Sequence, residues 1–394
     1  MDDKAGIAER ADIPQDRAPG RANRLRQVSE RRRAGSAKAA HNGVLSEASI
    51  HPEMLAVKGV KIWHHSPLGS ARSCQKGEQA MSNSINFPEP KMVRVNGVEL
   101  EVFEAGQENR GKPIVLCHGW PEHAYSWRHQ VPALVAAGYH VIVPNQRGYG
   151  NSSRPGDVTA YDIEHLAGDL VALLDHYGYD DATFMGHDWG AMVVWGLTLL
   201  HPGRVNRVIN LSLPYQERGE QPWITFMEAI LGGDFYFVHF NRQPGVADAV
   251  LEKNTSRFLG NLYRKNVPPA EPEPGMVMIN LARAEMPLGE PVMSENELAV
   301  FVSAFETSGF TGSINWYRNL DRNWHLLADV DPIIHQPTLM IYGNRDAVAK
   351  APNLKKFVPN VEVLSFDCGH WIQQEMPEET NQAVLDWLDR QGAA

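Results

Sequence analysis

One short segment constrains the fold of this chain more than any other. Residues 186–190, with the sequence GHDWG, separate two apolar runs. Residues 182–185 have the length and composition of a buried strand, and residues 191–200 have those of a buried helix. Glycines two positions either side of Asp188 permit a sharp turn between the two elements. The segment therefore predicts a strand, a tight turn and a helix, with the Asp188 carboxylate raised at the carboxyl-terminal edge of a sheet.

The residue type at this turn indicates which carbon the chain could attack. A serine in the same place would indicate acyl transfer. A carboxylate instead attacks saturated, electrophilic carbon and gives an ester that water can cleave later, whereas a serine would be trapped as an ether. Asp188 is therefore a candidate nucleophile. We expect the amides of the turn and the dipole of the following helix to help keep Asp188 ionised.

Strand and helix patterns alternate before and after the turn. Two alternating stretches between residues 92 and 105 flank an Asn96-Gly97 dipeptide, which predicts a β-hairpin. This alternation predicts an α/β fold, with a mostly parallel sheet and helices on both faces. The other predicted strands are 114–117, 141–144, 182–185, 208–213, 337–342 and 361–366, and the predicted helices are 127–137, 163–174, 191–200 and one that starts near Pro377.

The alternation stops between residues 215 and 330, where the segments are mostly helical in pattern and rich in Trp, Tyr, Phe, Met and Asn. We therefore predict an inserted helical cap at 215–330, between a first core part at 85–214 and a second at 331–394. A cap over the carboxyl-terminal edge of the sheet would place its inward side chains above Asp188. Several apolar side chains fit either a substrate pocket or the core of this cap, namely Trp223, Phe226, Met227, Phe237 and Trp316.

Residues 1–80 differ in composition from the rest of the 394-residue chain. They hold 14 Lys and Arg against 9 Asp and Glu, with Trp63 as their only aromatic residue, whereas the remainder holds 23 and 38, a net charge of −15. We expect residues 1–84 to be a disordered extension that buries little apolar surface, with Met81 as an alternative start. A basic nucleic-acid-binding arm and a targeting peptide are the alternatives. The acidic body argues against nucleic acid binding.

Composition also bears on the compartment. The best candidate for a membrane span, residues 191–200, is far shorter than the about 18 apolar residues that a span needs. Cys74, Cys117 and Cys368 are odd in number and have no C-x-x-C spacing, so neither a disulfide framework nor a zinc cluster is expected. We expect a reducing, cytoplasmic location.

Two further candidate residues follow predicted strands at the same edge of the sheet. Asp346 lies just past strand 337–342, and His370 lies just past strand 361–366. Because the carboxyl ends of parallel strands meet, Asp188, Asp346 and His370 are expected to lie together. Asp346 would orient and stabilise the imidazole of His370, which would remove a proton from water. The order nucleophile, acid, histidine is that of α/β-hydrolases.

The segment HGWP at residues 118–121 directly follows strand 114–117. Its backbone turn could aim the amide of Trp120 at the same pocket. Together with the amide of Trp189, it would form an oxyanion hole for the later, acyl step. The alternative is an ordinary glycine turn with the Trp120 ring packed in the core.

The chain resembles the soluble epoxide hydrolases of the α/β-hydrolase superfamily. The motifs that carry this resemblance are GHDWG, HGWP, QRGYG at 146–150, NWYRN at 315–319 and CGHW at 368–371, within a match from about residue 85 to the C-terminus. The resemblance implies that two cap tyrosines hold the epoxide oxygen, and the matching positions are Tyr317 and Tyr236, with Tyr263 as the competing choice for the second. A phenol suits this task because, with a pKa of about 10, it stays protonated at neutral pH and can donate to a developing alkoxide.

The implied reaction is hydrolysis of a small apolar epoxide by water to a vicinal diol, through an ester on Asp188 and without a metal or organic cofactor. A haloalkane dehalogenase is the runner-up, because it uses the same aspartate turn and the Trp189 indole could bind halide. Those enzymes often have Asn as a second halide donor where this chain has Trp120. A ligand receptor on a hydrolase scaffold is a third hypothesis. The particular epoxide, and the choice between a monomer and a homodimer, stay open.

Overall fold

The computed structural model describes residues 87–109, 113–265, 277–285 and 289–392. The expectations for residues 1–84, including the alternative start at Met81, lie outside the described residues.

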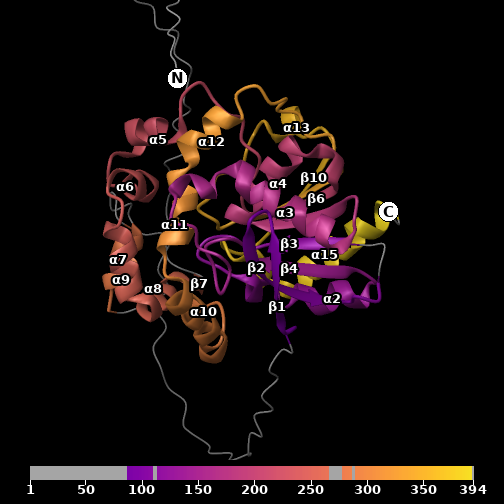
Figure 1. Ribbon diagram of the computed structural model, residues 1–394, viewed down its shortest axis with the longest axis horizontal. Coiled ribbons are helices and arrows are strands. Elements are labelled where there is room, and N and C mark those ends of the chain that lie inside the picture. Colours follow the sequence, from indigo (N-terminus) through magenta and orange to yellow (C-terminus); the bar gives the residue numbers. More distant parts are fainter. Residues whose placement is uncertain (1–86, 110–112, 266–276, 286–288, 393–394) are drawn as a thin grey trace, which may run out of the picture. The chain divides into compact units, whose positions relative to one another are not determined.

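An eight-stranded sheet forms the centre of the described chain (Figure 1). The strand order is β1-β2-β4-β3-β5-β6-β9-β10. Pairs β1–β2 and β2–β4 are antiparallel, and the other neighbours are parallel. The predicted mostly parallel α/β fold is therefore confirmed. The strands are β1 Pro90–Val95, β2 Val98–Ala105, β3 Pro113–Cys117, β4 His140–Asn145, β5 Ala182–His187, β6 Val205–Leu211, β9 Thr338–Gly343 and β10 Val361–Phe366.

Helices cover both faces of the sheet, as predicted. Successive residues of β3 point to opposite faces, so that Val115 belongs to the apolar cluster under α3 and α4, and Leu116 to the cluster under α2 and α15. All five residues of β3 are buried, which explains its continuous apolar sequence. The core helices are α2 Gln130–Ala136, α3 Ile163–Tyr177, α4 Trp189–Leu200, α13 Leu354–Phe357, α14 Ile372–Glu375 and α15 Pro377–Arg390, with 3-10 helices η2 Ala124–Trp127, η3 Val158–Tyr161 and η4 Pro202–Arg204.

Several element boundaries differ from the sequence prediction by one to three residues, and two of these differences have a clear cause. The helix expected over residues 127–137 begins only at Gln130, because residues up to Trp127 form the separate 3-10 helix η2. The strand expected over residues 208–213 ends at Leu211, because Ser212 has a left-handed backbone with φ 68°. The turn at Ser212 belongs to the site described below.

Helices α5 to α12, in the region that the sequence predicts as a cap and that is called the cap below, gather beside the sheet in Figure 1. They contact the core through buried polar bonds, since the Trp316 indole donates to the Arg147 carbonyl at 3.1 Å and the Arg128 guanidinium pairs with Glu297 at 2.6 Å. A short antiparallel pair within the cap, β7 with β8, was not predicted. The cap elements are α5 Trp223–Leu231, α6 Tyr236–Arg242, α7 Val246–Lys253, α8 Thr255–Leu262, β7 Arg264–Lys265, α9 Val277–Arg283, β8 Glu290–Pro291, α10 Glu295–Ser308, α11 Thr311–Arg318 and α12 Leu320–Leu326.

Within the described ranges, no helix is both long enough and apolar enough to cross a bilayer.

Candidate active site

Asp188 stands at the turn between β5 and α4, with φ 50° and ψ −120°. Few residues other than glycine adopt such a backbone. The glycines on either side are needed for close packing, because a Cβ at Gly186 would lie 2.6 Å from the carbonyl oxygen of Gly190. A Cβ at Gly190 would collide with the carbonyl of Cys117 at the end of β3. The absence of side chains at Gly186 and Gly190 therefore lets the turn that carries Asp188 pack closely against the end of β3 and the loop that follows it.

The two carboxylate oxygens of Asp188 face different groups. Oδ1 accepts a hydrogen bond from the Trp120 amide at 2.9 Å, and the Trp189 amide also donates to the carboxylate. Oδ2 lies 3.8 Å from Nε2 of His370, which is too long for a direct hydrogen bond. The side chains of Asp188 and His370 remain 17% and 24% exposed. Oδ1 is thus held by the Trp120 amide, whereas Oδ2 is the oxygen that faces His370.

Asp346 and His370 also come together. Nδ1 of His370 lies 3.1 Å from each oxygen of the Asp346 carboxylate. The Ser212 hydroxyl donates to Oδ2 of Asp346 at 2.6 Å, and the Val348 amide donates to Oδ1 at 3.0 Å. Burial alone would raise the pKa of the Asp346 carboxyl, but the charge and hydrogen bonds of His370 and Ser212 hold this pKa well below its usual range.

The histidine and the nucleophile candidate influence each other's charge. Burial lowers the pKa of His370, but the carboxylates of Asp346 and Asp188 outweigh it and raise this pKa to about 9. Burial also raises the pKa of Asp188 above its usual value, against the opposing effects of His370, His187 and the amides of Trp120 and Trp189. The amides therefore favour the ionised nucleophile as expected, although burial outweighs them.

Two cap tyrosines lie close to this carboxylate. Tyr236 begins α6 and Tyr317 lies in α11, with their ring centroids 5.9 Å apart and their hydroxyls hydrogen-bonded to each other. Burial, followed by nearby charges that include Asp188, raises the pKa of Tyr236 and of Tyr317 well above the usual value. Both phenols are therefore protonated at neutral pH.

Tyr263, the competing choice, is engaged elsewhere. Its hydroxyl donates to the carbonyl of Pro121 at 2.8 Å, and its ring lies 4.4 Å from that of Trp371. It braces the HGWP loop against the cap. The pairing with Tyr317 is thus made by Tyr236.

Both indole N–H groups near the nucleophile already have partners in the protein. Nε1 of Trp120 donates to the hydroxyl of Ser313 at 3.1 Å, while its ring packs against Phe240. The Trp189 side chain hydrogen-bonds to Tyr317, with ring centroids 4.9 Å apart. Trp120 therefore combines the two sequence interpretations, because its ring packs in the core and its amide faces Asp188.

A buried pair that sequence reasoning did not single out ties three loops together. Nδ1 of His187 lies 2.7 Å from Oε2 of Glu122, and Nε2 of His187 lies 2.8 Å from the His370 carbonyl. The same Glu122 oxygen accepts from the Gly119 amide at 2.8 Å. Glu122 follows the HGWP segment directly and His187 precedes the nucleophile candidate, so their neighbours in sequence were the only signal that could have identified them.

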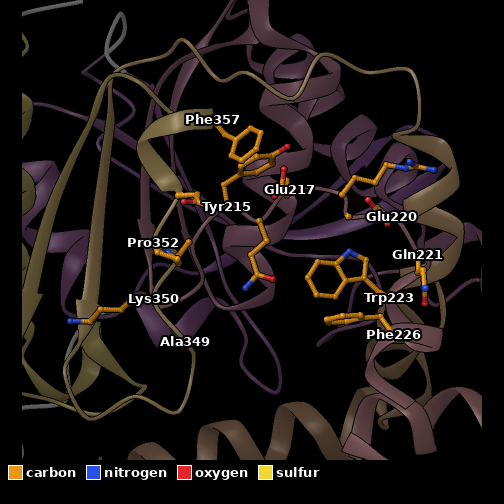
Figure 2. Close-up of a pocket in the computed structure, with 15 residues that line it drawn as sticks. Tyr215, Glu217, Glu220, Gln221, Trp223, Phe226, Ala349, Lys350, Pro352 and Phe357 are labelled. Atoms are coloured by element: carbon orange, nitrogen blue, oxygen red, sulfur yellow. The ribbon is translucent and has the colours of Figure 1, made fainter. Parts of the chain in front are cut away.

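A cavity of about 580 Å³ lies between the start of the cap and the segment that follows β9. Figure 2 shows Trp223 and Phe226 of α5 on one wall and Pro352 and Phe357 on another. Tyr215, which also lines it, lies three residues beyond Ser212. Two of the five apolar residues singled out in the sequence thus line a cavity. Trp316 does not, because it is fully buried between cap and core.

Comparisons with known proteins extend these observations. A family model described as alpha/beta hydrolase fold matches residues 112–377. Epoxide hydrolase A of Mycobacterium tuberculosis is 42% identical over 318 residues, which cover 77% of this chain and 98% of that protein. Bifunctional epoxide hydrolase 2 of Rattus norvegicus is 35% identical over 307 residues, which cover 74% of this chain but only 54% of that longer protein.

Solved structures agree with these sequence matches. The crystal structure of epoxide hydrolase A from Mycobacterium thermoresistibile aligns with a TM-score of 0.71 and 40% identity, over 77% of this chain and 98% of that one. Potato (Solanum tuberosum) epoxide hydrolase I aligns with a TM-score of 0.68 and 32% identity, over 77% of this chain and 99% of that one. Fold, sequence and structural likeness point to one family: the chain belongs to the epoxide hydrolases of the α/β-hydrolase superfamily.

Proposed function

We propose that the protein hydrolyses an epoxide to a vicinal diol through a covalent hydroxyalkyl ester on Oδ2 of Asp188. The observation that carries this proposal is that the two carboxylate oxygens of Asp188 have different neighbours. The Trp120 amide holds Oδ1 and the Trp189 amide also donates to the carboxylate, whereas Oδ2 is 3.8 Å from Nε2 of His370. This arrangement suits a carboxylate that attacks with one oxygen and later becomes an ester whose carbonyl oxygen, Oδ1, already sits in an oxyanion hole.

In the first half-reaction, Oδ2 of Asp188 attacks a ring carbon and the carbon–oxygen bond of the epoxide breaks. The electron pair moves to the epoxide oxygen, which takes a proton from the phenol pair of Tyr236 and Tyr317. Because the pKa of each phenol is raised, the phenolate that remains after the proton is donated is a strong base and must be reprotonated. The His370 imidazolium is a suitable donor for this replacement.

In the second half-reaction, neutral His370 removes a proton from water, which attacks Cγ of the Asp188 ester. The charge that builds on Oδ1 is stabilised by the amides of Trp120 and Trp189. The Cγ–Oδ2 ester linkage then breaks, and Oδ2 leaves in the diol with one of the two protons of the water, while the other proton stays on His370 for the next cycle. One oxygen of the diol therefore comes from the epoxide and the other from the carboxylate, while the oxygen of water stays in Asp188.

The cavity beside α5 indicates the kind of substrate. Its aromatic walls suit an apolar arm of the epoxide, and it borders the segments that carry Ser212 and Asp346. We take residues 215–330 to be a cap that covers this cavity and the nucleophile. An epoxide with an aromatic or aliphatic arm fits this arrangement better than a charged one.

The dehalogenase alternative receives less support. A halide leaving group needs N–H donors that are free to bind it, whereas the Trp120 indole is bonded to Ser313 and the Trp189 indole to Tyr317. The two adjacent phenols instead match an oxygen that must be protonated. Halide release from haloalkanes without diol formation from epoxides would reverse this ranking.

A single-turnover experiment in ¹⁸O-labelled water tests the covalent route. With enzyme in excess over an epoxide such as styrene oxide, the first-turnover diol should carry no label, and the peptide that contains Asp188 should gain one ¹⁸O. Asp188→Ala should form no diol, and Asp180→Ala, which alters an exposed carboxylate near the start of β5, should match the wild type. Label found in the first-turnover diol would exclude the ester, because water would then have attacked the epoxide directly.

A further inference from the structure

Ser212 has an unusual backbone for its residue type. Three non-glycine residues have a positive φ among those that the structure describes: Asn96, Asp188 and Ser212. Asn96 lies in a hairpin turn, where this backbone is ordinary. Asp188 is the nucleophile candidate. Ser212, with φ 68°, is not in a hairpin, so the free energy that this backbone costs must be offset by what the turn achieves.

The turn at Ser212 directs its side chain toward the neighbouring strand. The Ser212 amide donates to the carbonyl of Ile341 in β9 at 2.9 Å, and the Leu213 amide donates back to Leu211 at 2.9 Å. The regular backbone of β6 therefore ends at Leu211, and the chain turns at Ser212. The side chain, only 1% exposed, meets Asp346 in the loop after β9.

The Ser212 hydroxyl completes a triangle with the acid and the histidine. It lies 2.6 Å from Oδ2 of Asp346 and 3.1 Å from Nδ1 of His370. An ionised carboxylate has no proton to give, so the single Ser212 proton goes to Asp346. The serine oxygen then offers a lone pair to the Nδ1–H of His370. Every edge of the triangle is thereby a hydrogen-bonding contact.

We propose that Ser212 is a positioning residue for the ester-hydrolysis half-reaction, because its hydroxyl fixes the Asp346 carboxylate and the His370 imidazole relative to each other. This inference rests on the proposed function. His370 accepts the proton of water at Nε2 only while Nδ1–H faces the acid. Without the hydroxyl, Oδ2 of Asp346 keeps only its contact with His370 and the carboxylate is held less firmly, so the imidazole points at the ester for less of the time.

Ester hydrolysis requires Nε2 of His370 to be aimed at the attacking water, whereas in ester formation His370 only returns a proton to the phenol pair, so the two half-reactions should respond differently to loss of the hydroxyl. In Ser212→Ala, rapid-quench mass spectrometry should show ester decay slowed about 10-fold, as loss of one hydrogen bond to a charged group predicts. Ester formation should stay within about 2-fold of the wild-type rate. The protein should therefore carry more of the substrate adduct at steady state.

Ser212→Gly separates the hydroxyl from the backbone. Glycine adopts φ 68° without strain, whereas alanine does not, so the glycine variant should melt at a higher temperature than the alanine variant. Both variants lack the hydroxyl and should show the same slow ester decay. Ser152→Ala removes another buried serine hydroxyl, which donates to the Asn145 carbonyl and not to Asp346, and should leave both half-reaction rates unchanged.

The outcomes are distinct. Ester decay at the wild-type rate in both Ser212 variants would overturn the inference, and so would an equal slowing of both half-reactions. If the wild-type protein forms diol without any adduct on Asp188, the proposed function fails instead, whatever the Ser212 variants do.

Discussion

The contact between Arg128 and Glu297 offers a quantitative test of how the cap is held on the core. Arg128 is 1% exposed at the end of η2, and its Nε lies 2.6 Å from Oε1 of Glu297 in the first turn of α10. Gln374 supplies a neutral acceptor at 2.8 Å. Glu297→Gln removes one charge while keeping an oxygen for the capping interaction with Ser294. The guanidinium would then be buried without a carboxylate.

The size of the effect follows from the pKa of Glu297. Burial tends to raise this pKa, but hydrogen bonds from Ser294 and the contact with Arg128 lower it from 4.5 to about 2. A shift of that size corresponds to about 3.4 kcal/mol of folding free energy at neutral pH. Because 22% of the Glu297 side chain is exposed, solvent screening reduces this to about 2 kcal/mol. Glu297→Gln should therefore lower the Tm by about 2–3 °C at pH 7.

The stabilising effect of Glu297 should also depend on pH in a defined direction. The pKa of Glu297 is lower in the folded state, so its stabilising contribution is present above about pH 4.5 and is lost as pH falls toward about 2. The difference in Tm between wild type and Glu297→Gln should shrink across that window in thermal melts followed by circular dichroism. Glu228→Gln, in an exposed pair with Arg242, should change the Tm by less than 1 °C. Equal Tm values at pH 7, or a difference that stays constant down to pH 2.5, would refute the reasoning.

Two further predictions concern the cap. Tyr236→Phe and Tyr317→Phe should each lower kcat/KM for epoxide hydrolysis by about 10-fold to 100-fold, because each removes a proton donor to the opening ring. Tyr263→Phe should change this value by less than 3-fold. A loss of activity confined to Tyr263→Phe would show that Tyr236 and Tyr317 are not the proton donors. If the cavity beside α5 receives the apolar arm as proposed, Trp223→Ala should raise KM by about 5-fold for an epoxide with a long apolar arm and leave KM for a short one unchanged. Equal effects on both substrates would place the arm elsewhere.

Much of the fold could be predicted because its signals are local. Strand β10 occupies the predicted residues 361–366, and β3 extends the predicted strand by one residue. The turn at Asp188 was equally visible, since the glycines that its packing requires lie two positions away. β7 and β8, two residues each, are too short to show any periodicity.

The parts of the site that could not be predicted depend on contacts between distant segments. Glu122 lies 65 residues from His187 and 251 from Gln373, and both contacts exist only once the loops have met. Ser212 could not be identified from the sequence for another reason. A serine between Leu211 and Leu213 fits the pattern of a strand that continues through it. The partner of its hydroxyl is Asp346, 134 residues away. The choice between Tyr236 and Tyr263 likewise needed the orientation of the cap helices.

The charge on Asp188 links the two half-reactions of the proposed cycle. While Asp188 is a carboxylate, it helps to raise the pKa of His370 to about 9, so the histidine begins as an acid. Ester formation removes that charge, which lowers the pKa of His370 when a base is needed next. Asp346 cannot provide this change, because its own charge persists throughout. In the proposed cycle the nucleophile therefore controls the timing of its own release, whereas Asp346 raises the pKa of His370 throughout the cycle and, with Ser212, keeps the imidazole in place.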